Sequence, residues 1–306
     1  GVQDPSGWSV ARIARELPNR SQLGAIYTYR NSPSGSGDYG PTYAFDGRLG
    51  IGDIWEFSAL AGLSETPGVN AGREILSFGG QFRGRDWSGQ VYYDKVGENF
   101  DPALGFVSYP GFRESKVQLE RTFRPAVPWM REVRIQSNRI SAYNKDGFKE
   151  LDFWHEHLYL TFENGGTFYP SINFVHEGLT EPFRIRGTDI EVPAGTYRGW
   201  TSYATFRTNP SAPVSMNGRW DVGTYLSGSR LGGNLGVSIR QGATLTGGVS
   251  LSHNRLSLPE GDYNTTRTRV NAQYAFSQGA FIQGVVQYSD QTGIWSGNVR
   301  FGWLDT

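Results

Sequence analysis

Apolar and polar residues alternate with a period of two along most of the chain. The clearest segment covers residues 266–276, where one face would carry Val270, Ala272, Tyr274 and Phe276 and the other Arg267, Arg269, Asn271 and Gln273. Such alternation is typical of half-exposed β-strands, and helical periodicity is almost absent. The pattern therefore predicts an all-β fold.

The same alternation recurs in segment after segment, and each segment is closed by Gly, Asn, Asp, Ser or Pro. We expect seventeen strands, which lie within residues 8–17, 21–30, 41–50, 53–62, 73–84, 86–96, 114–124, 132–143, 149–163, 166–178, 195–208, 214–226, 234–240, 244–252, 266–276, 279–289 and 294–304.

The connections between these segments carry a second signal, because short and long ones alternate. The short ones lie near residues 17–20, 50–53, 84–86, 164–166, 240–243 and 277–279. The long ones cover residues 31–40, 63–72, 97–113, 179–194, 254–264 and 289–293. Two connections depart from this alternation. The connection at residues 125–130 is long where a short turn is expected, and the one at residues 227–230 is short where a long loop is expected. Short turns at one end and long loops at the other are typical of bacterial membrane barrels.

The two faces of the predicted strands favour lipid on one side. In the last third of the chain the polar faces are rich in Arg, Gln, Asn, Ser and Thr, whereas the apolar faces mix small aliphatic residues with aromatic residues at strand ends. An apolar band between two aromatic girdles is typical of outer-membrane barrels. We therefore predict that residues 1–306 form a transmembrane antiparallel up-and-down β-barrel of 16 or more strands in the bacterial outer membrane.

The parity of the strands suggests that this barrel is incomplete. If the short turns are periplasmic, the first of seventeen strands descends from the outside and the last one also ends inside. Closed bacterial barrels have an even number of strands. We expect the chain to be a part of a larger barrel, unless one more strand lies near Phe183 to Val192.

A faint internal repeat precedes two of the predicted strands. Pro193, Gly195 and Tyr197 have the same spacing as Pro259, Gly261 and Tyr263, four strands later. Repeated hairpin units would suit a sheet that closes on itself, because closure leaves no unpaired edge.

Composition narrows the function classes. The 306 residues hold 29 Lys plus Arg and 29 Asp plus Glu, so the formal net charge is zero, and the chain has no Cys. A neutral chain lacks the basic surface that nucleic acid requires. Without Cys, disulfide scaffolds and thiolate metal sites are excluded. No apolar run approaches the length of a transmembrane helix.

Several short stretches carry a resemblance to a known family, and the most specific is Asn99 to Val107 with Arg113 nearby. The others are residues 7–12, 19–25, 258–261, 274–277, 286–288 and 298–303. Together they resemble a bacterial outer-membrane family of unknown function, in which a family-nine-type carbohydrate-binding-like module precedes a large C-terminal β-barrel. The resemblance implies an outer-membrane location and more barrel on both sides of this segment. It implies no activity.

The polar strand faces offer the main candidate chemistry. We expect a lumen lined by a basic wall with neutral hydrogen-bonding neighbours, formed by Arg219, Asp221, Arg240, Arg267, Arg269, Asn271, Gln283, Gln287 and Arg300. Such walls set the preference of a pore for anions or polar solutes. These side chains could instead pair with carboxylates and fill the lumen.

Three histidines are weaker candidates for a metal site. His155 and His157 would share one strand face, and His176 lies one hairpin further along the chain. Imidazole is a common metal ligand, but no carboxylate joins the three in the sequence pattern. We therefore expect no metal and no cofactor.

We predict a channel, or a platform for transport or export, that handles polar solutes or exported material without enzymatic chemistry. Its partners would be outer-membrane lipid and further envelope proteins. A soluble carbohydrate-binding β-sandwich is the alternative, because alternation alone does not choose between sandwich and barrel. An outer-membrane enzyme ranks third, because Ser252 and His253 are adjacent on a strand and would point to opposite faces.

Overall fold

The computed structural model describes residues 7–31, 40–102, 104–107 and 109–303. The chain forms two compact units, of which unit 1 comprises Gly1–Arg121 and Ser137–Trp154, and unit 2 comprises Thr122–Gln136 and His155–Thr306. No helix in the described residues is long and apolar enough to cross a membrane.

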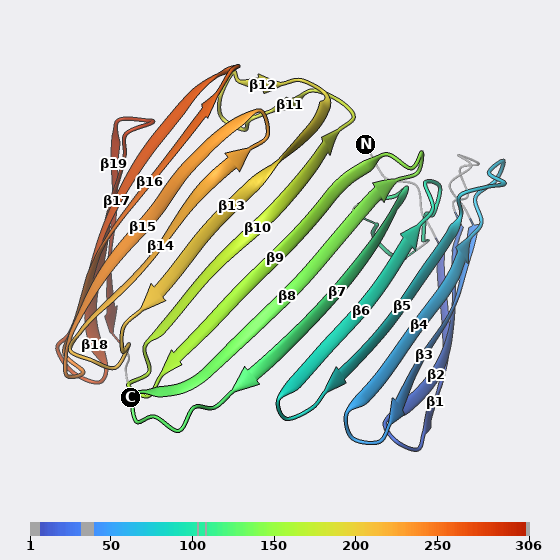
Figure 1. Cartoon of the computed structure of the whole chain (residues 1–306), viewed down its shortest axis with the longest axis horizontal. Helices are drawn as coiled ribbons and strands as arrows, with labels where there is room; N and C mark the ends of the chain where they lie inside the picture. The colour runs from blue at the N-terminus through green and yellow to red at the C-terminus, as the bar shows by residue number, and fades with distance from the viewer. Residues whose placement is uncertain (1–6, 32–39, 103, 108, 304–306) are drawn as a thin grey trace. The chain divides into compact units, whose positions relative to one another are not determined.

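Strands account for almost all of the regular structure (Figure 1). They are β1 (Gly7–Leu17), β2 (Ser21–Asn31), β3 (Gly40–Ile51), β4 (Trp55–Ser64), β5 (Glu74–Arg83), β6 (Trp87–Val96), β7 (Phe112–Phe123), β8 (Met130–Asn144), β9 (Lys149–Phe162), β10 (Thr167–Leu179), β11 (Phe183–Arg184), β12 (Glu191–Val192), β13 (Gly195–Arg207), β14 (Val214–Tyr225), β15 (Gly228–Gln241), β16 (Leu245–Leu258), β17 (Gly261–Ala275), β18 (Ala280–Ser289) and β19 (Ile294–Trp303).

Seventeen of these strands belong to one sheet, and β11 and β12 form a separate two-stranded sheet. From β1 to β7 each strand pairs antiparallel with the next one along the chain. The same holds from β13 to β19, and β13 also pairs with β10. The predicted all-β fold, with 16 or more antiparallel strands that follow one another up and down, is confirmed.

The predicted connections need three corrections. Residues 254–264 are not a long loop, because β16 continues to Leu258 and β17 begins at Gly261. Phe183 to Val192 adds no strand to the large sheet, since β11 and β12 pair only with each other. The turn after β14 is short, as expected for residues 227–230, and the turn after β16 is short as well, so the alternation of short and long connections weakens after β13.

In unit 2 the register of β14–β18 separates an apolar face from a polar face. Val249, at the middle of β16, pairs with Val237 on β15 and Val270 on β17, and Val270 pairs with Val286 on β18. The neighbouring Ser250 pairs with Gly236 and Arg269 and therefore lies on the opposite face. Val249 is 51% exposed. Other large side chains on this apolar face are exposed to a similar extent, among them Trp220, Leu231, Leu235, Ile239, Leu251 and Tyr274.

Unit 1 has the same two-faced construction. Its apolar face includes Phe45, Leu49, Phe78, Val91 and Val117, which are all exposed. On β6, Val91 pairs with Gly80 on β5 and Val117 on β7, whereas the adjacent Gln90 pairs with Gln81 and Gln118 on the polar face.

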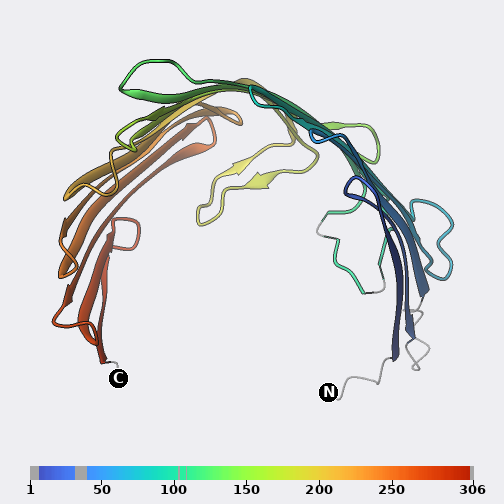
Figure 2. The same cartoon turned by 90° about the horizontal axis from the view of Figure 1, so that it is seen from below.

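The connection between β10 and β13 folds back as a small hairpin and forms the main buried apolar cluster in unit 2 (Figure 2). The hairpin contributes Ile185, Ile190 and Val192, and the sheet contributes Leu256 and Leu258. The aromatic side chains that pack around them are Tyr197, Tyr225 and Tyr263. In the register, Leu256 and Tyr263 pair with each other in the same row as Arg230, so the hairpin covers the polar face.

This packing gives the internal repeat a structural reason. Tyr197 and Tyr263, the last residues of the two repeated triplets, both pack against the hairpin cluster. Gly261 has a φ of 148°, and a Cβ there would lie 3.2 Å from Cγ1 of Ile190. Glycine at this position therefore permits both the backbone conformation and the close approach of the hairpin.

Candidate functional site

All nine residues predicted to line a lumen lie on the polar face of unit 2. One row of register partners joins Arg240, Thr246, Gln273, Gln283 and Arg300 from β15 to β19. A second row joins Ser250, Arg269 and Gln287, and a third joins Arg219, Asn234, Ser252 and Arg267. Asn271 and Asp221 share the same face, because Asn271 pairs with Gly248 and Asp221 pairs with Gly232.

The arginines of this face differ in their partners. Arg219 forms an ion pair with Asp221, in which Nη2 lies 2.6 Å from Oδ1. Its guanidinium also stacks over the Tyr203 ring at 3.9 Å from the centroid. Arg240, Arg267, Arg269 and Arg300 form no ion pair with any described carboxylate. Most of the basic wall therefore keeps its charge uncompensated.

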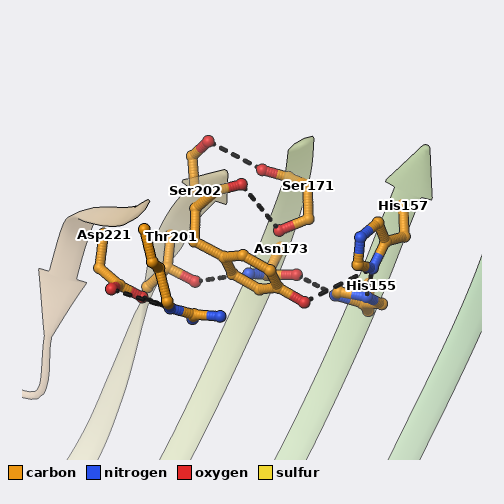
Figure 3. A network of polar contacts seen from close by, with 9 residues as sticks. His155, His157, Ser171, Asn173, Thr201, Ser202 and Asp221 are labelled. Carbon is orange, nitrogen blue, oxygen red and sulfur yellow. Dashed lines mark hydrogen bonds and ion pairs between the residues drawn. The ribbon is translucent and has the colours of Figure 1, made fainter. Parts of the chain in front are cut away.

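Next to Arg219, a chain of polar contacts crosses β9, β10 and β13 (Figure 3). His155 Nε2 lies 3.0 Å from His157 Nδ1, and His155 Nδ1 contacts the side-chain carbonyl oxygen of Asn173. Asn173 Nδ2 donates to Thr201 Oγ1 at 2.9 Å. His155, His157 and Asn173 are all buried, so this network is held away from bulk solvent. Most buried polar groups in folded proteins are hydrogen-bonded.

Tyrosine rings enclose this network. Tyr159 stacks on His157 with ring centroids 3.9 Å apart, and the Tyr203 hydroxyl lies 3.5 Å from His157 Nδ1. Tyr169 packs against both His157 and Tyr159, and Arg134 lies over the Tyr159 ring at 4.5 Å. The result is a rigid aromatic and polar patch in which hydrogen-bond geometry is fixed by ring stacking.

His176 lies apart from the other two candidate histidines. His176 is three residues from Asn173 on β10 and so lies on the other face, where its Nδ1 accepts from Arg198 Nε at 3.2 Å. His157 Nε2 is buried without a hydrogen-bond partner. No group of three His, Asp or Glu side chains in the described part of the chain could hold a metal ion. Two imidazoles remain, and both are committed to the hydrogen-bonded network.

Ser252 and His253 do not form a catalytic pair. Ser252 pairs with Asn234 and Arg267 on the polar face. His253 lies on the opposite face, and its Nδ1 is 3.0 Å from Thr266 Oγ1. The two side chains of the dyad thus point away from each other.

Two connections outside the strands show clear charge effects. In unit 1, an ion pair of 2.7 Å with Glu98 raises the pKa of Lys145. In unit 2, hydrogen bonds from the backbone of Thr266 and from the hydroxyls of Thr266 and Thr265 lower the pKa of Asp290. Both groups therefore stay charged at neutral pH.

Sequence reasoning assigned the arginines to the same strand face as the register does, and their role in lining a lumen stays a prediction. It missed much of the network. Tyr203 is two residues from Thr201 and from Thr205 along one strand, and this spacing could have assigned it to the same polar face. Its contact with Arg219 depends on the register between β13 and β14, in which Tyr203 pairs with Asp221. Pairing registers between strands are not contained in the pattern of a single strand.

Three solved structures that are similar to this chain are of an outer-membrane protein. OmpT of Vibrio cholerae, folded in vitro, matches with a TM-score of 0.40 and 8% identity over 97% of this chain and 94% of that chain. OmpT expressed in the outer membrane matches with a TM-score of 0.40 and 9% identity over 94% of this chain and 88% of that chain. An OmpT variant that lacks loop L8 gives a TM-score of 0.39 and 10% identity over 96% and 97% of the two chains.

No protein-family model and no curated protein sequence matches the chain. The family of unknown function that the sequence resembles therefore stays a prediction. TM-scores of 0.40 and below do not assign a function to this chain.

Proposed function

We propose that this chain is an outer-membrane β-barrel protein and that polar solutes, anions in preference to cations, pass along its polar face. The observation that carries this proposal is that the same strands present an exposed apolar face on one side and an arginine-rich face on the other. Arg240, Arg267, Arg269 and Arg300 lie on the second face without described carboxylate partners.

The exposed apolar face supports a lipid environment. Contiguous apolar patches on soluble monomers rarely exceed a few hundred Å². Here such side chains continue from β14 to β19, and they include Trp220, Leu235, Val249, Val270, Val286 and Val299. Burial of apolar surface is worth about 25 cal/mol per Å², so leaving this face in water would be costly.

Strand length and pairing support the same environment. The strands of the large sheet are 10 to 15 residues long, and about 9–11 residues suffice to cross a bilayer at the tilt of membrane barrels. Each strand from β14 to β18 pairs on both sides, which satisfies its backbone groups without water.

A soluble β-sandwich would bury the apolar face against a second sheet. In this structure Val249 and Leu251 are 51% and 48% exposed. The alternative therefore lacks support from the packing. Electrostatic and steric filtering needs no covalent step, so the proposed function is not enzymatic.

Two measurements test the proposal. In detergent, the folded chain should migrate faster on a gel than the boiled chain, and it should not stay soluble when detergent is removed. A chain that remains monomeric without detergent would exclude the membrane location. In planar bilayers with a KCl gradient, the reversal potential should indicate a preference for chloride, and a folded protein without current would exclude the passage.

A further inference from the structure

A pocket opens on the polar face of unit 2, beside the β11–β12 hairpin. Its volume is about 320 Å³, and its polar lining comes from Arg230, Ser252, Asn254, Tyr263, Thr265 and Arg267. This volume lies at the lower end of the range for small-molecule sites. The strands β15, β16 and β17 supply these residues, which makes the site part of the sheet and not of a loop.

Both arginines of this pocket are available to an anion. Neither Arg230 nor Arg267 forms an ion pair with a described carboxylate, and no carboxylate belongs to the pocket lining. At the edge of the pocket, Thr265 Oγ1 donates to Asp290 Oδ1 at 3.3 Å. An arginine guanidinium binds carboxylate and phosphate groups through two parallel hydrogen bonds.

The floor between the two arginines is neutral and hydrophilic. Gly232, Asn254 and Thr265 follow one another in a single register row. A Cβ on Gly232 would lie 2.6 Å from Asn254 Oδ1, so glycine leaves room for the amide. Amide and hydroxyl groups both donate and accept hydrogen bonds, which suits a ligand with several hydroxyls.

The hairpin fixes one wall of the pocket. Tyr225, Leu256 and Tyr263 line the pocket and also pack against the buried cluster of Ile185, Ile190 and Val192. Val192 is completely buried, and Ile185 N donates to Ile190 O at 2.9 Å, so this wall is well ordered. Flat aromatic and aliphatic surfaces beside polar groups are suited to the C–H face of a sugar ring.

We propose that this pocket binds a small polyhydroxylated organic anion, a sugar acid or a sugar phosphate. The acidic group pairs with Arg230 or Arg267, the hydroxyls bond to Ser252, Asn254 and Thr265, and the ring lies against Tyr263. This assignment rests on the proposed function, because it names the solute class that the polar face accepts.

Binding is measured on the full chain folded in detergent micelles, by isothermal titration with glucuronate, glucose 6-phosphate, glucose and inorganic phosphate. We expect at least one of the two sugar anions to bind about tenfold or more tightly than glucose and than inorganic phosphate, because a hydrogen-bonded charge pair contributes about 1.5–3 kcal/mol. Arg230→Gln and Arg267→Gln should each weaken that binding by about tenfold or more.

Arg240→Gln is the matched control, because it removes the same charge from the same face and Arg240 is not part of the pocket. It should change the affinity less than twofold. If Arg240→Gln and Arg267→Gln lowered the affinity equally, binding would depend only on the net charge of the polar face, and the proposed site would be overturned. Equal binding of inorganic phosphate and the sugar anions would overturn the role of the hydroxyls. Heat-modifiable mobility and conductance are recorded for each variant, so failure of the site is distinguished from failure of the proposed passage.

Discussion

The polar face of β1–β7 and the polar face of β14–β19 are built on the same strand geometry but carry different charges. In β1–β7, carboxylates lie beside cations and amides: Asp46 pairs with Arg12, and Glu56 accepts a hydrogen bond from Gln81. Asp94, Glu114 and Glu120 continue this mixture. On the polar face of the described strands β14–β19, Asp221 is the one carboxylate among the arginines, and it is paired with Arg219.

This difference shows that strand periodicity decides the environment of a face, while the choice of charged residue decides its chemistry. The apolar faces of the two regions are alike, as Val91 and Val249 indicate with exposed fractions of 43% and 51%. On the mixed face of β1–β7, Asp46 compensates the charge of Arg12. The face of β14–β19 leaves positive charge available, and for this reason we assign solute selection to it.

The largest expected effect comes from placing a charge on either apolar face. Val91→Arg and Val249→Arg should each destabilise the membrane-inserted fold by about 2–4 kcal/mol, because both would place a cation in the hydrocarbon layer. Gln90→Arg is the control, since its side chain lies on the polar face between Gln81 and Gln118. The measurement is urea-induced unfolding in lipid vesicles. Equal stability of Val91→Arg and Gln90→Arg would remove the basis for a lipid-facing side.

The second effect separates the buried network of unit 2 from the exposed pairs of unit 1. Asn173→Ala should cost about 1–3 kcal/mol, because it removes the side-chain oxygen that contacts Nδ1 of the buried His155 imidazole. Asp46→Asn should cost at most about 1 kcal/mol, because its ion pair with Arg12 is exposed to solvent. Unfolding in the same vesicles measures both, and a larger loss for Asp46→Asn would contradict the ranking.

The third effect concerns ion selectivity. Replacement of Arg269 and Arg300 by Gln should move the reversal potential in a KCl gradient toward cations, because it removes unpaired positive charge. Glu56→Gln in β4 should move it in the opposite direction and by less, since the mixed face retains neighbouring charges of both signs. If Glu56→Gln moved the reversal potential as far as the arginine replacements or further, ion selection could not be assigned to the face of β14–β19.

The smallest effects are found in two connections that respond at opposite ends of the pH range. The raised pKa of Lys145 stabilises the folded state. This stabilisation is complete below about pH 10.4 and is lost as pH rises through the folded-state pKa. The lowered pKa of Asp290 also stabilises the folded state. This stabilisation is present above about pH 3.9 and is lost as pH falls through the folded-state pKa.

Each contribution is isolated by a neutral variant. Lys145→Met should lower the unfolding midpoint slightly at neutral pH and match the unchanged chain at strongly alkaline pH. Asp290→Asn should lower it slightly at neutral pH and match the unchanged chain at strongly acidic pH. A pH-independent difference in either variant would assign the effect to packing instead of charge.

Alternation along single strands was enough to predict seventeen strands and the face on which Arg267, Arg269 and Arg300 lie. It failed at Leu256 and Leu258, which are apolar but lie on the polar face because the hairpin residues Ile185 and Ile190 cover them. This interruption of the pattern made residues 254–264 resemble a loop. A long-range contact had overridden the local signal, and no single-strand pattern contains it.

The same limit explains the candidate site. His155 and His157 were placed together because they are two residues apart on one strand. The contacts that connect these histidines to Asn173, Thr201 and Tyr203 depend on the registers among β9, β10 and β13. His176 is three residues from Asn173 on β10, so its side chain lies on the opposite face.

The central claim, that alternate residues face lipid and water, is tested most directly by cysteine scanning of β16. The chain has no Cys, so each variant carries a single thiol. In lipid vesicles, a charged water-soluble thiol reagent should label cysteines placed at Gly248, Ser250 and Ser252 and should not label those placed at Val249 and Leu251. In a second experiment a fluorophore is attached to the cysteines at Val249 and Leu251, and a lipid-soluble nitroxide should quench its fluorescence. Equal labelling of all five positions by the water-soluble reagent in a folded protein would contradict the account.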